Sequence, residues 1–346
     1  MTPDPITVLV VAPNWLGDAV MALPAVADVR RRYPLARLCV AARRGVADLM
    51  RLSPLVDEVI PLEWSGQLWR GNARRADADR LRASGASLAI LFPNSFASAY
   101  IVQQAGIAER WGYASDLRTR FLTRAITRPT RKLHQSEYYQ QLVVALGMEP
   151  GPLEPELAVP PAALEDARAL LAQHGWNGRS RLVALAPGAA YGRAKQWVPS
   201  HVVSLVTALV RDHGTMCVLL GSRADAALTR EIRDAIPSTH TNNVIDLAGA
   251  TSLQQLAAVL AVSQACVAND SGAMHVAAAV GAPVVAIFGP TIVEATRPLV
   301  RRGGRVEVLT HRVWCRPCML RECPIDHRCM TRITPERVLA TLEAMQ

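Results

Sequence analysis

The chain has 346 residues, of which half are hydrophobic and 19% are charged. This composition excludes a disordered protein, and the length suits two α/β domains better than one core. The formal net charge is +9, and Lys132 and Lys195 are the only lysines. A genome biased toward arginine codons explains the choice of arginine over lysine, but it does not explain the excess of basic over acidic residues. A basic surface suits an anionic partner, and the lack of zinc-finger spacing or an aromatic-rich basic strand argues against nucleic acid.

The sequence predicts neither a membrane span nor a secretory signal. The best apolar run, residues 276–288, is short and is interrupted by Gly281 and Pro283. Residues 1–5 place no basic patch ahead of an apolar stretch, so no signal peptide is expected.

Strand and helix patterns alternate along the first half. Residues 6–11 are a β-branched run typical of a buried parallel strand, and residues 19–32 show helical spacing with charges clustered at the end. Residues 115–132 differ, because they carry six basic side chains with little helical order. The other expected elements are strands at 38–41, 56–62 and 88–92 and helices at 46–52, 73–84 and 134–146.

Five prolines between residues 149 and 161 predict an extended linker between two domains. We expect an N-terminal domain over 1–155, a C-terminal domain over 162–332, and a last helix within 333–346 that packs back toward the N-terminal domain. The second half repeats the plan of the first. Its expected elements are helices at 164–174, 197–213, 224–235, 252–262, 272–280 and 335–345 and strands at 182–186, 216–220, 244–247, 265–268 and 284–288.

This alternation predicts the α/β class, with two Rossmann-like doubly wound domains facing across a cleft and ligands at the carboxyl ends of the strands. The loop from Asn14 to Asp18 lies at such an end, and Gly17 permits a tight turn or a close approach there. Asp18 has two interpretations. It is a helix cap worth roughly 1 kcal/mol, or it is a carboxylate placed to take a proton from a hydroxyl.

Residues 186–197 form the corresponding loop of the second half. They lack the glycine spacing and the Lys-Ser/Thr ending of a Walker A loop. Small residues would let the backbone approach a ligand, and Arg193 and Lys195 could neutralise a diphosphate. The alternative is a surface loop with two solvated cations.

Residues 267–275 are the sharpest local signal. A strand ends at Asn269-Asp270 and a helix begins at Ser271-Gly272, so the first N–H groups of that helix and its dipole predict an anion site. His275 lies one turn later, on the same face as Ser271. The alternative is an N-cap at Asp270 or Ser271 with a semi-buried histidine.

Motifs placed in order along nearly the whole chain form a recognisable set. They are Asn14-Trp15-Leu16-Gly17-Asp18 with Leu23-Pro24-Ala25, Pro187-Gly188-Ala189 with Lys195-Gln196-Trp197, Asn269-Asp270-Ser271-Gly272-Ala273-Met274-His275 with Gly281-Ala282-Pro283, and Phe288-Gly289-Pro290-Thr291. Together they resemble the bacterial ADP-heptose–lipopolysaccharide heptosyltransferase family. The closing segment, from Cys315 to Met330, is similar to the heptosyltransferase II branch.

The resemblance implies a glycosyltransferase B fold and an inverting, metal-independent transfer without a cofactor. Asp18 would be the general base that deprotonates the acceptor hydroxyl, and Lys195 would stabilise the departing ADP diphosphate. The sequence departs from some members at Ala190 and Tyr191, where a hydroxyl-bearing pair can occur, which weakens any claim of side-chain phosphate contacts there. The other donor-binding candidates are Gly188, Arg193, Asp225, Thr251, Leu253, Asp270, Ser271, Gly272 and His275.

The implied reaction moves L-glycero-D-manno-heptose from ADP-heptose onto the heptosyl-Kdo-lipid A inner core. It would take place in the cytoplasm, with a monomer held peripherally on the inner face of the inner membrane. Two alternatives stay open: a transferase of the same family with another nucleotide sugar or acceptor, and a non-catalytic nucleotide or glycolipid binder. The arginines of residues 115–132 are acceptor-binding candidates or a solvated basic surface. The acceptor-binding candidates are Asn14, Gly17, Arg118, Arg120 and Arg124.

The seven cysteines fall into two groups. Cys39, Cys217 and Cys266 lie in apolar, strand-like contexts and are expected in the core. The late cysteines could hold structural zinc, stay reduced in a compact loop, or form disulfides, which a cytoplasmic setting disfavours. Their spacing is Cys315-x2-Cys318-x4-Cys323-x5-Cys329, with His327 nearby.

Overall fold

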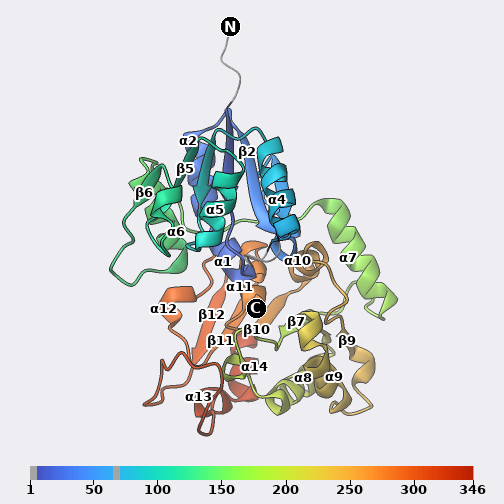
Figure 1. The fold of residues 1–346 in the computed structure, drawn as a ribbon. Helices are drawn as coiled ribbons and strands as arrows, with labels where there is room; N and C mark the ends of the chain where they lie inside the picture. The colour runs from blue at the N-terminus through green and yellow to red at the C-terminus, as the bar shows by residue number, and fades with distance from the viewer. Residues whose placement is uncertain (1–5, 65–70, 346) are drawn as a thin grey trace. The chain divides into compact units, whose positions relative to one another are not determined.

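The computed structural model describes residues 6–64 and 71–345 (Figure 1). The expectation for residues 1–5 lies outside the described residues. The chain divides into two compact units, Met1–Ala158 (unit 1) and Val159–Gln346 (unit 2). The division falls inside the proline-rich segment.

Unit 1 is built on a six-stranded sheet whose strands are all parallel, in the order β3-β2-β1-β4-β5-β6. The inner strands are almost wholly buried, as the runs of aliphatic residues predict. The strands are β1 (Thr7–Val11), β2 (Arg37–Arg43), β3 (Glu58–Leu62), β4 (Leu88–Leu91), β5 (Glu109–Tyr113) and β6 (Arg124–Ile126). The helices are α1 (Leu16–Met21), α2 (Leu23–Arg32), α3 (Arg44–Met50), α4 (Gly71–Ala83), α5 (Phe96–Gln104) and α6 (Gln135–Ala145).

The helix predicted over residues 19–32 is two helices, α1 and α2. Pro24 lies at the start of α2 and has no N–H to donate to the carbonyl of Val20, so the hydrogen-bond ladder is interrupted there. The hydrophobic spacing runs on through the break, which is why the sequence pattern does not show it.

Three elements of unit 1 were not predicted: α5, β5 and β6. The apolar sequence of α5 carries no polar stripe, so it has no helical periodicity to detect. Its start is capped by Ser95, whose side chain accepts a hydrogen bond from the Ser98 N–H at 3.3 Å. β6 has only three residues and lies at the sheet edge, so its exposed, basic sequence does not resemble a buried strand.

The proline-rich segment has no regular structure in residues 149–160. Its start is hydrogen-bonded to α2 and α6. Asp28, buried in α2, accepts hydrogen bonds from the Gly151 N–H at 3.1 Å and from Gln140 Nε2 at 3.0 Å. Burial raises the pKa of Asp28 despite these donors. The beginning of the segment is therefore held by a specific contact.

Unit 2 has a second six-stranded parallel sheet, in the order β12-β11-β10-β7-β8-β9. The strands β7, β10 and β11 are buried along their whole length. The strands are β7 (Leu182–Ala186), β8 (Met216–Leu219), β9 (Val244–Asp246), β10 (Ala265–Asn269), β11 (Val284–Phe288) and β12 (Val306–Thr310). The helices are α7 (Pro161–Gln173), α8 (Pro199–His213), α9 (Ala226–Asp234), α10 (Leu253–Val262), α11 (Gly272–Ala279), α12 (Val293–Thr296), α13 (Arg328–Thr331) and α14 (Pro335–Ala344).

The last helix, α14, packs inside unit 2. Its residues Val338 and Leu342 belong to the core that also contains Leu205 and Leu209 of α8. The expectation that the C-terminal helix also packs back toward the N-terminal domain stays a prediction, and the contacts that define its buried face are those with α8. An amphipathic pattern shows that a helix must bury one face, but it does not identify the partner. The short helices α12 and α13 and the strand β12 were not predicted.

Among the described helices, none combines the length and the apolar character needed to cross a bilayer.

Candidate active site

Both sheets share one strand order, which is 3-2-1-4-5-6 when the strands are numbered within each unit. The order reverses between β1 and β4 in unit 1 and between β7 and β10 in unit 2. Open parallel sheets bind ligands at the carboxyl ends of the strands beside such a reversal. The three predicted loops all fall at these points: residues 12–18 follow β1, residues 187–195 follow β7, and Asp270 follows β10.

Asp18 lies in the first turn of α1 and is not the capping residue. The N-cap is Trp15, and no side chain caps the helix by a hydrogen bond. The Tyr139 hydroxyl of α6 donates to Asp18 Oδ1 at 3.3 Å. Burial, together with the charge of Asp18, raises the pKa of Tyr139 well above its ordinary value, so the phenol stays protonated and can keep donating. The carboxylate is thus held at the edge of the sheet.

Sequence reasoning missed Tyr139, because nothing in the pattern of α6 connects it to a residue 121 positions earlier. The neighbouring tyrosine is also tied to this edge: Asn94 Nδ2, just after β4, donates to the Tyr138 hydroxyl at 2.8 Å. Two adjacent tyrosines of α6 therefore contact the segments that follow β1 and β4, the strands at the reversal of unit 1.

The acceptor-binding candidates occupy different environments. Asn14 is exposed and Gly17 half-buried, on either side of Trp15. Arg120 and Arg124 are exposed, and Arg124 Nη1 donates to the Leu146 carbonyl at 3.1 Å. The role of all four in acceptor binding stays a prediction.

Arg118 does not belong to an exposed basic surface, and that part of the expectation is corrected. Its side chain is fully buried. Its Nε donates to the Tyr113 carbonyl at 2.9 Å, and its Nη1 donates to the Pro93 carbonyl and to Ser98 Oγ. Burial lowers the pKa of Arg118 to about 10. The guanidinium joins the ends of β4 and β5, because unsatisfied carbonyls there attract a buried donor.

Lys195 and Asp270 form the centre of the site in unit 2. Lys195 belongs to a 3₁₀ turn, Arg193–Lys195, and its Nζ lies 2.6 Å from Asp270 Oδ2. Their side chains are only 14% and 5% exposed. Lys195 Nζ also lies 4.9 Å from the centre of the Tyr191 ring, a cation–π distance. The surface-loop interpretation of Lys195 is therefore wrong, because the ammonium group is fixed against the end of β10.

Two threonines that were not predicted as site residues complete the surroundings of Asp270. Thr291 Oγ1 donates to Asp270 Oδ2 at 2.6 Å, and Thr296 Oγ1 lies 3.4 Å from Oδ1. Both carboxylate oxygens are thus occupied within unit 2. Asp270 is placed to orient Lys195, whose other N–H groups can face a ligand. Thr291 lies after Gly289 and Pro290, which follow the end of β11, so its position after a buried parallel strand was the available signal.

The helix α11 begins where the sequence predicts an anion site. Ser271 is its N-cap but makes no side-chain capping bond, and Gly272 is the first helical residue. A helix start leaves its first N–H groups without partners inside the helix, and its dipole favours an anion. His275 is buried one turn further on. Ser271 is therefore the N-cap by its backbone position, as the alternative interpretation predicts, but its hydroxyl does not cap the helix.

Asn269, at the end of β10, holds the loop that follows β7. Its Nδ2 donates to the Pro187 carbonyl at 2.5 Å, and its Oδ1 accepts from the Trp197 N–H at 3.1 Å. This amide was quoted for the resemblance but not as a site residue. It fixes both ends of the loop that carries Lys195.

Two predicted donor-binding residues, one after β7 and one after β8, meet directly. A Cβ atom on Gly188 would overlap the carboxyl group of Asp225, so only glycine permits this approach. Asp225 Oδ2 accepts from the Ser222 N–H at 2.8 Å, in a capping box. Thr251 and Leu253 flank the N-cap of α10, after β9, and Arg193 is exposed. Their contacts with a donor stay predictions.

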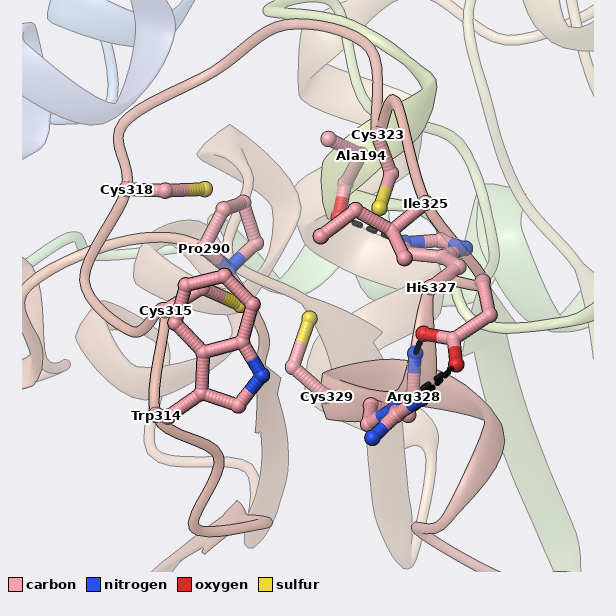
Figure 2. A pocket seen from close by; sticks show the side chains of 11 residues that line it. Ala194, Pro290, Trp314, Cys315, Cys318, Cys323, Ile325, His327, Arg328 and Cys329 are labelled. Atoms are coloured by element: carbon pink, nitrogen blue, oxygen red, sulfur yellow. Dashed lines mark hydrogen bonds and ion pairs between the residues drawn. The ribbon is translucent and has the colours of Figure 1, made fainter.

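The four late cysteines line one cavity of about 30 Å³, together with Ala194 and His327. Figure 2 shows their sulfur atoms pointing toward this space. All are free thiols. Across the described part of the chain, no group of three His, Cys, Asp or Glu side chains is placed to hold one metal ion. Structural zinc and reduced cysteines in a compact loop both stay predictions for this segment.

We expect thiol reagents at pH 8 to label three cysteines of the folded protein and all seven after denaturation. Burial raises the pKa of the other four, with Cys39 and Cys329 at about 11 and Cys217 and Cys266 at about 12. At a pKa of 11, roughly one thiol in a thousand is ionised at pH 8, and the thiolate is the nucleophile. The half-exposed cysteines that should react are Cys315, Cys318 and Cys323.

Iodoacetamide labelling followed by peptide mass spectrometry measures each site separately. If the three half-exposed cysteines resist labelling until a chelator is added, this expectation is contradicted and the zinc interpretation is supported.

Comparison with known proteins identifies the family. The model for glycosyltransferase family 9 (heptosyltransferase) matches residues 74–328. The chain is 31% identical to lipopolysaccharide heptosyltransferase 2 of Salmonella typhimurium, with 98% of each chain covered. The solved structure of ADP-heptose lps heptosyltransferase II from E. coli is 30% identical, covers 98% of each chain and has a TM-score of 0.83.

A glycosyl transferase family 9 structure from Veillonella parvula has a TM-score of 0.84 at 19% identity, covering 100% of this chain and 98% of the other, and supports the fold. The predicted fold class, two Rossmann-like halves of the glycosyltransferase B type, is confirmed. The predicted resemblance is confirmed as well, and the non-catalytic alternative loses its support. This chain belongs to glycosyltransferase family 9, the heptosyltransferases, and is a glycosyltransferase.

Proposed function

We propose that the protein transfers a heptose from ADP-heptose to the heptosyl-Kdo-lipid A inner core of lipopolysaccharide. Relatives that match over 98% of their length are lipopolysaccharide heptosyltransferases, and the solved E. coli relative is described as an ADP-heptose enzyme. The observation that carries the proposal is the Lys195–Asp270 pair beside the start of α11. A fixed cation next to a helix N-terminus suits a diphosphate leaving group.

In the proposed reaction, Asp18 removes the proton of the acceptor hydroxyl as its oxygen attacks the anomeric carbon. The bond from that carbon to the diphosphate oxygen breaks, and ADP departs with the electron pair. Attack from the face opposite the leaving group inverts the anomeric configuration. Tyr139 keeps the carboxylate of Asp18 oriented, and Lys195 meets the charge that develops on the diphosphate.

The donor and acceptor also explain the basic composition. A formal net charge of +9 suits the phosphates of the acceptor glycolipid and an anionic membrane face. We infer a monomer that works peripherally on the cytoplasmic face of the inner membrane. The exposed side chains of Arg120, Arg124 and Trp15 are candidates for contact with the acceptor or its membrane.

A donor screen tests the proposal. Purified protein is given a heptosyl-Kdo-lipid A acceptor with ADP-heptose, ADP-glucose or UDP-glucose, and product is measured by mass spectrometry. We expect ADP-heptose to be used at least tenfold faster than the others, and EDTA to leave the rate unchanged because Lys195 and α11 act on the leaving group. Preferred use of another donor would support the alternative of a different sugar. Binding of ADP without transfer to any acceptor would support a non-catalytic binder.

A further inference from the structure

The two side chains that hold Asp270 come from two separate loops of unit 2. Lys195 belongs to residues 187–195 (the Lys195 loop), and Thr291 belongs to residues 289–291 (the Thr291 loop). If Lys195 meets the leaving group, as proposed above, its position depends on both loops. The segment over residues 314–330 contacts both of them, and we call it the clamp segment.

The clamp segment binds the Lys195 loop through main-chain contacts on both sides of Ala194. The Ala194 N–H donates to the Arg321 carbonyl at 2.9 Å, and the Ala194 carbonyl lies 2.8 Å from His327 Nε2. Figure 2 shows this hydrogen bond beside the cysteine-lined cavity. Nearby, a Cβ atom on Gly192 would overlap the Arg321 main chain, and the φ of Gly192 is 154°. Glycine is therefore needed where the loop meets the clamp segment.

The ring that packs against Lys195 is held by the same segment. The Tyr191 hydroxyl donates to the Met319 carbonyl at 2.7 Å, and the guanidinium of Arg321 lies 5.3 Å from the centre of the Tyr191 ring. Lys195 Nζ lies 4.9 Å from that centre. The clamp segment thus contacts both the Tyr191 side chain, which lies beside the Lys195 ammonium group, and the main chain next to Lys195.

The Thr291 loop is bound in a similar way. Arg316 Nε donates to the Gly289 carbonyl at 2.7 Å, and the Met319 N–H donates to the Pro290 carbonyl at 3.0 Å. Arg316 Nη2 lies 3.4 Å from the Thr291 carbonyl. One segment therefore holds both loops that reach Asp270.

Backbone conformation points to the same two residues of the clamp segment. In the described residues of unit 2, Met319 and His327 are the non-glycine residues with left-handed backbone, at φ 57° and 55°. This conformation is uncommon for side chains with a Cβ and persists where surrounding contacts enforce it. Met319 contacts both loops and His327 contacts the Lys195 loop.

We propose that the clamp segment positions the donor site, with His327 as the positioning residue that sets Lys195 through Ala194. A carbonyl oxygen only accepts hydrogen bonds, so Nε2 of His327 carries the proton in this contact. Ala194 is buried and directly precedes Lys195, so a shift of its carbonyl moves the ammonium group relative to Asp270. Small displacements of a catalytic group lower transfer rates strongly.

The test compares three variants in the full-length protein. His327→Phe keeps an aromatic ring but removes the donor to the Ala194 carbonyl, and His327→Gln restores an N–H at a similar reach. His174→Phe is the matched control, because His174 is exposed and lies after α7 in the same unit. We expect His327→Phe to lower kcat/KM for the donor about tenfold, the effect of one lost hydrogen bond. KM for the acceptor should stay unchanged, and His327→Gln should recover most of the loss.

A double-mutant cycle separates positioning from general loss of structure. In a Lys195→Met background, His327→Phe should change the residual rate less than twofold, because the group it positions is already gone. A tenfold loss in both backgrounds, or a loss not recovered by His327→Gln, would overturn the proposal. Wild-type protein that transfers no sugar from ADP-heptose would contradict the proposed function instead. An active wild type with an equally active His327→Phe variant would contradict only the role of His327.

Discussion

Replacing Asp18 with asparagine should lower kcat by roughly 100- to 10,000-fold while leaving ADP affinity within twofold. Asparagine keeps the shape of the side chain and can still contact the Tyr139 hydroxyl, but it cannot accept a proton at neutral pH. The loss should therefore appear in turnover. Single-turnover kinetics with ADP-heptose and acceptor measures the chemical step, and calorimetry measures ADP binding.

The control for this prediction is Asp48→Asn. Asp48 lies in α3 of the same unit and is paired with Arg51, and its side chain is 47% exposed. A surface pair of this kind contributes little to stability, so activity should not change. If the kcat of Asp18→Asn lies within tenfold of the wild-type value, Asp18 is not the base.

Replacing Lys195 with methionine should lower kcat/KM for the donor by roughly 100- to 1,000-fold, the effect of losing one preorganised electrostatic group. ADP affinity should fall as well, in contrast to Asp18→Asn, because the ammonium group also meets the ground-state diphosphate. Lys132→Met is a well-matched control, because it removes the only other lysine of the chain, an exposed one in unit 1.

Lys195→Met should also lower the free energy of unfolding by about 3 kcal/mol, because it leaves the buried Asp270 carboxylate without its cation. The double variant Lys195→Met/Asp270→Asn should regain stability without regaining activity. Denaturant titration measures the stability of both proteins. Recovery of activity in the double variant would show that Lys195 serves only to neutralise Asp270.

The sequence by itself determined the class of fold and predicted the places where chemistry can occur. Aliphatic runs such as those of β1 and β10 predict buried parallel strands, because a strand covered on both faces has no polar positions. Loops rich in glycine and charge after such strands predict ligand sites, since parallel strands end together at one edge of the sheet. Asp18, Lys195 and Asp270 were found by this local reasoning, and their family by the order of the motifs.

Only the tertiary structure decided which of these groups meet and which are structural. Tyr139 contacts Asp18, Thr291 contacts Asp270, and His327 contacts the main chain of Ala194 beside Lys195. Each comes from another element, and nothing in local spacing encodes such contacts. Arg118 shows the converse: other basic residues of the same segment, such as Arg120 and Arg124, are exposed, but the Arg118 guanidinium is buried against carbonyl groups at the ends of β5 and β4. The packing partner of α14 was undetermined for the same reason. Hydrophobic periodicity specifies that a face is buried, whereas the partner depends on how all the elements fill space together.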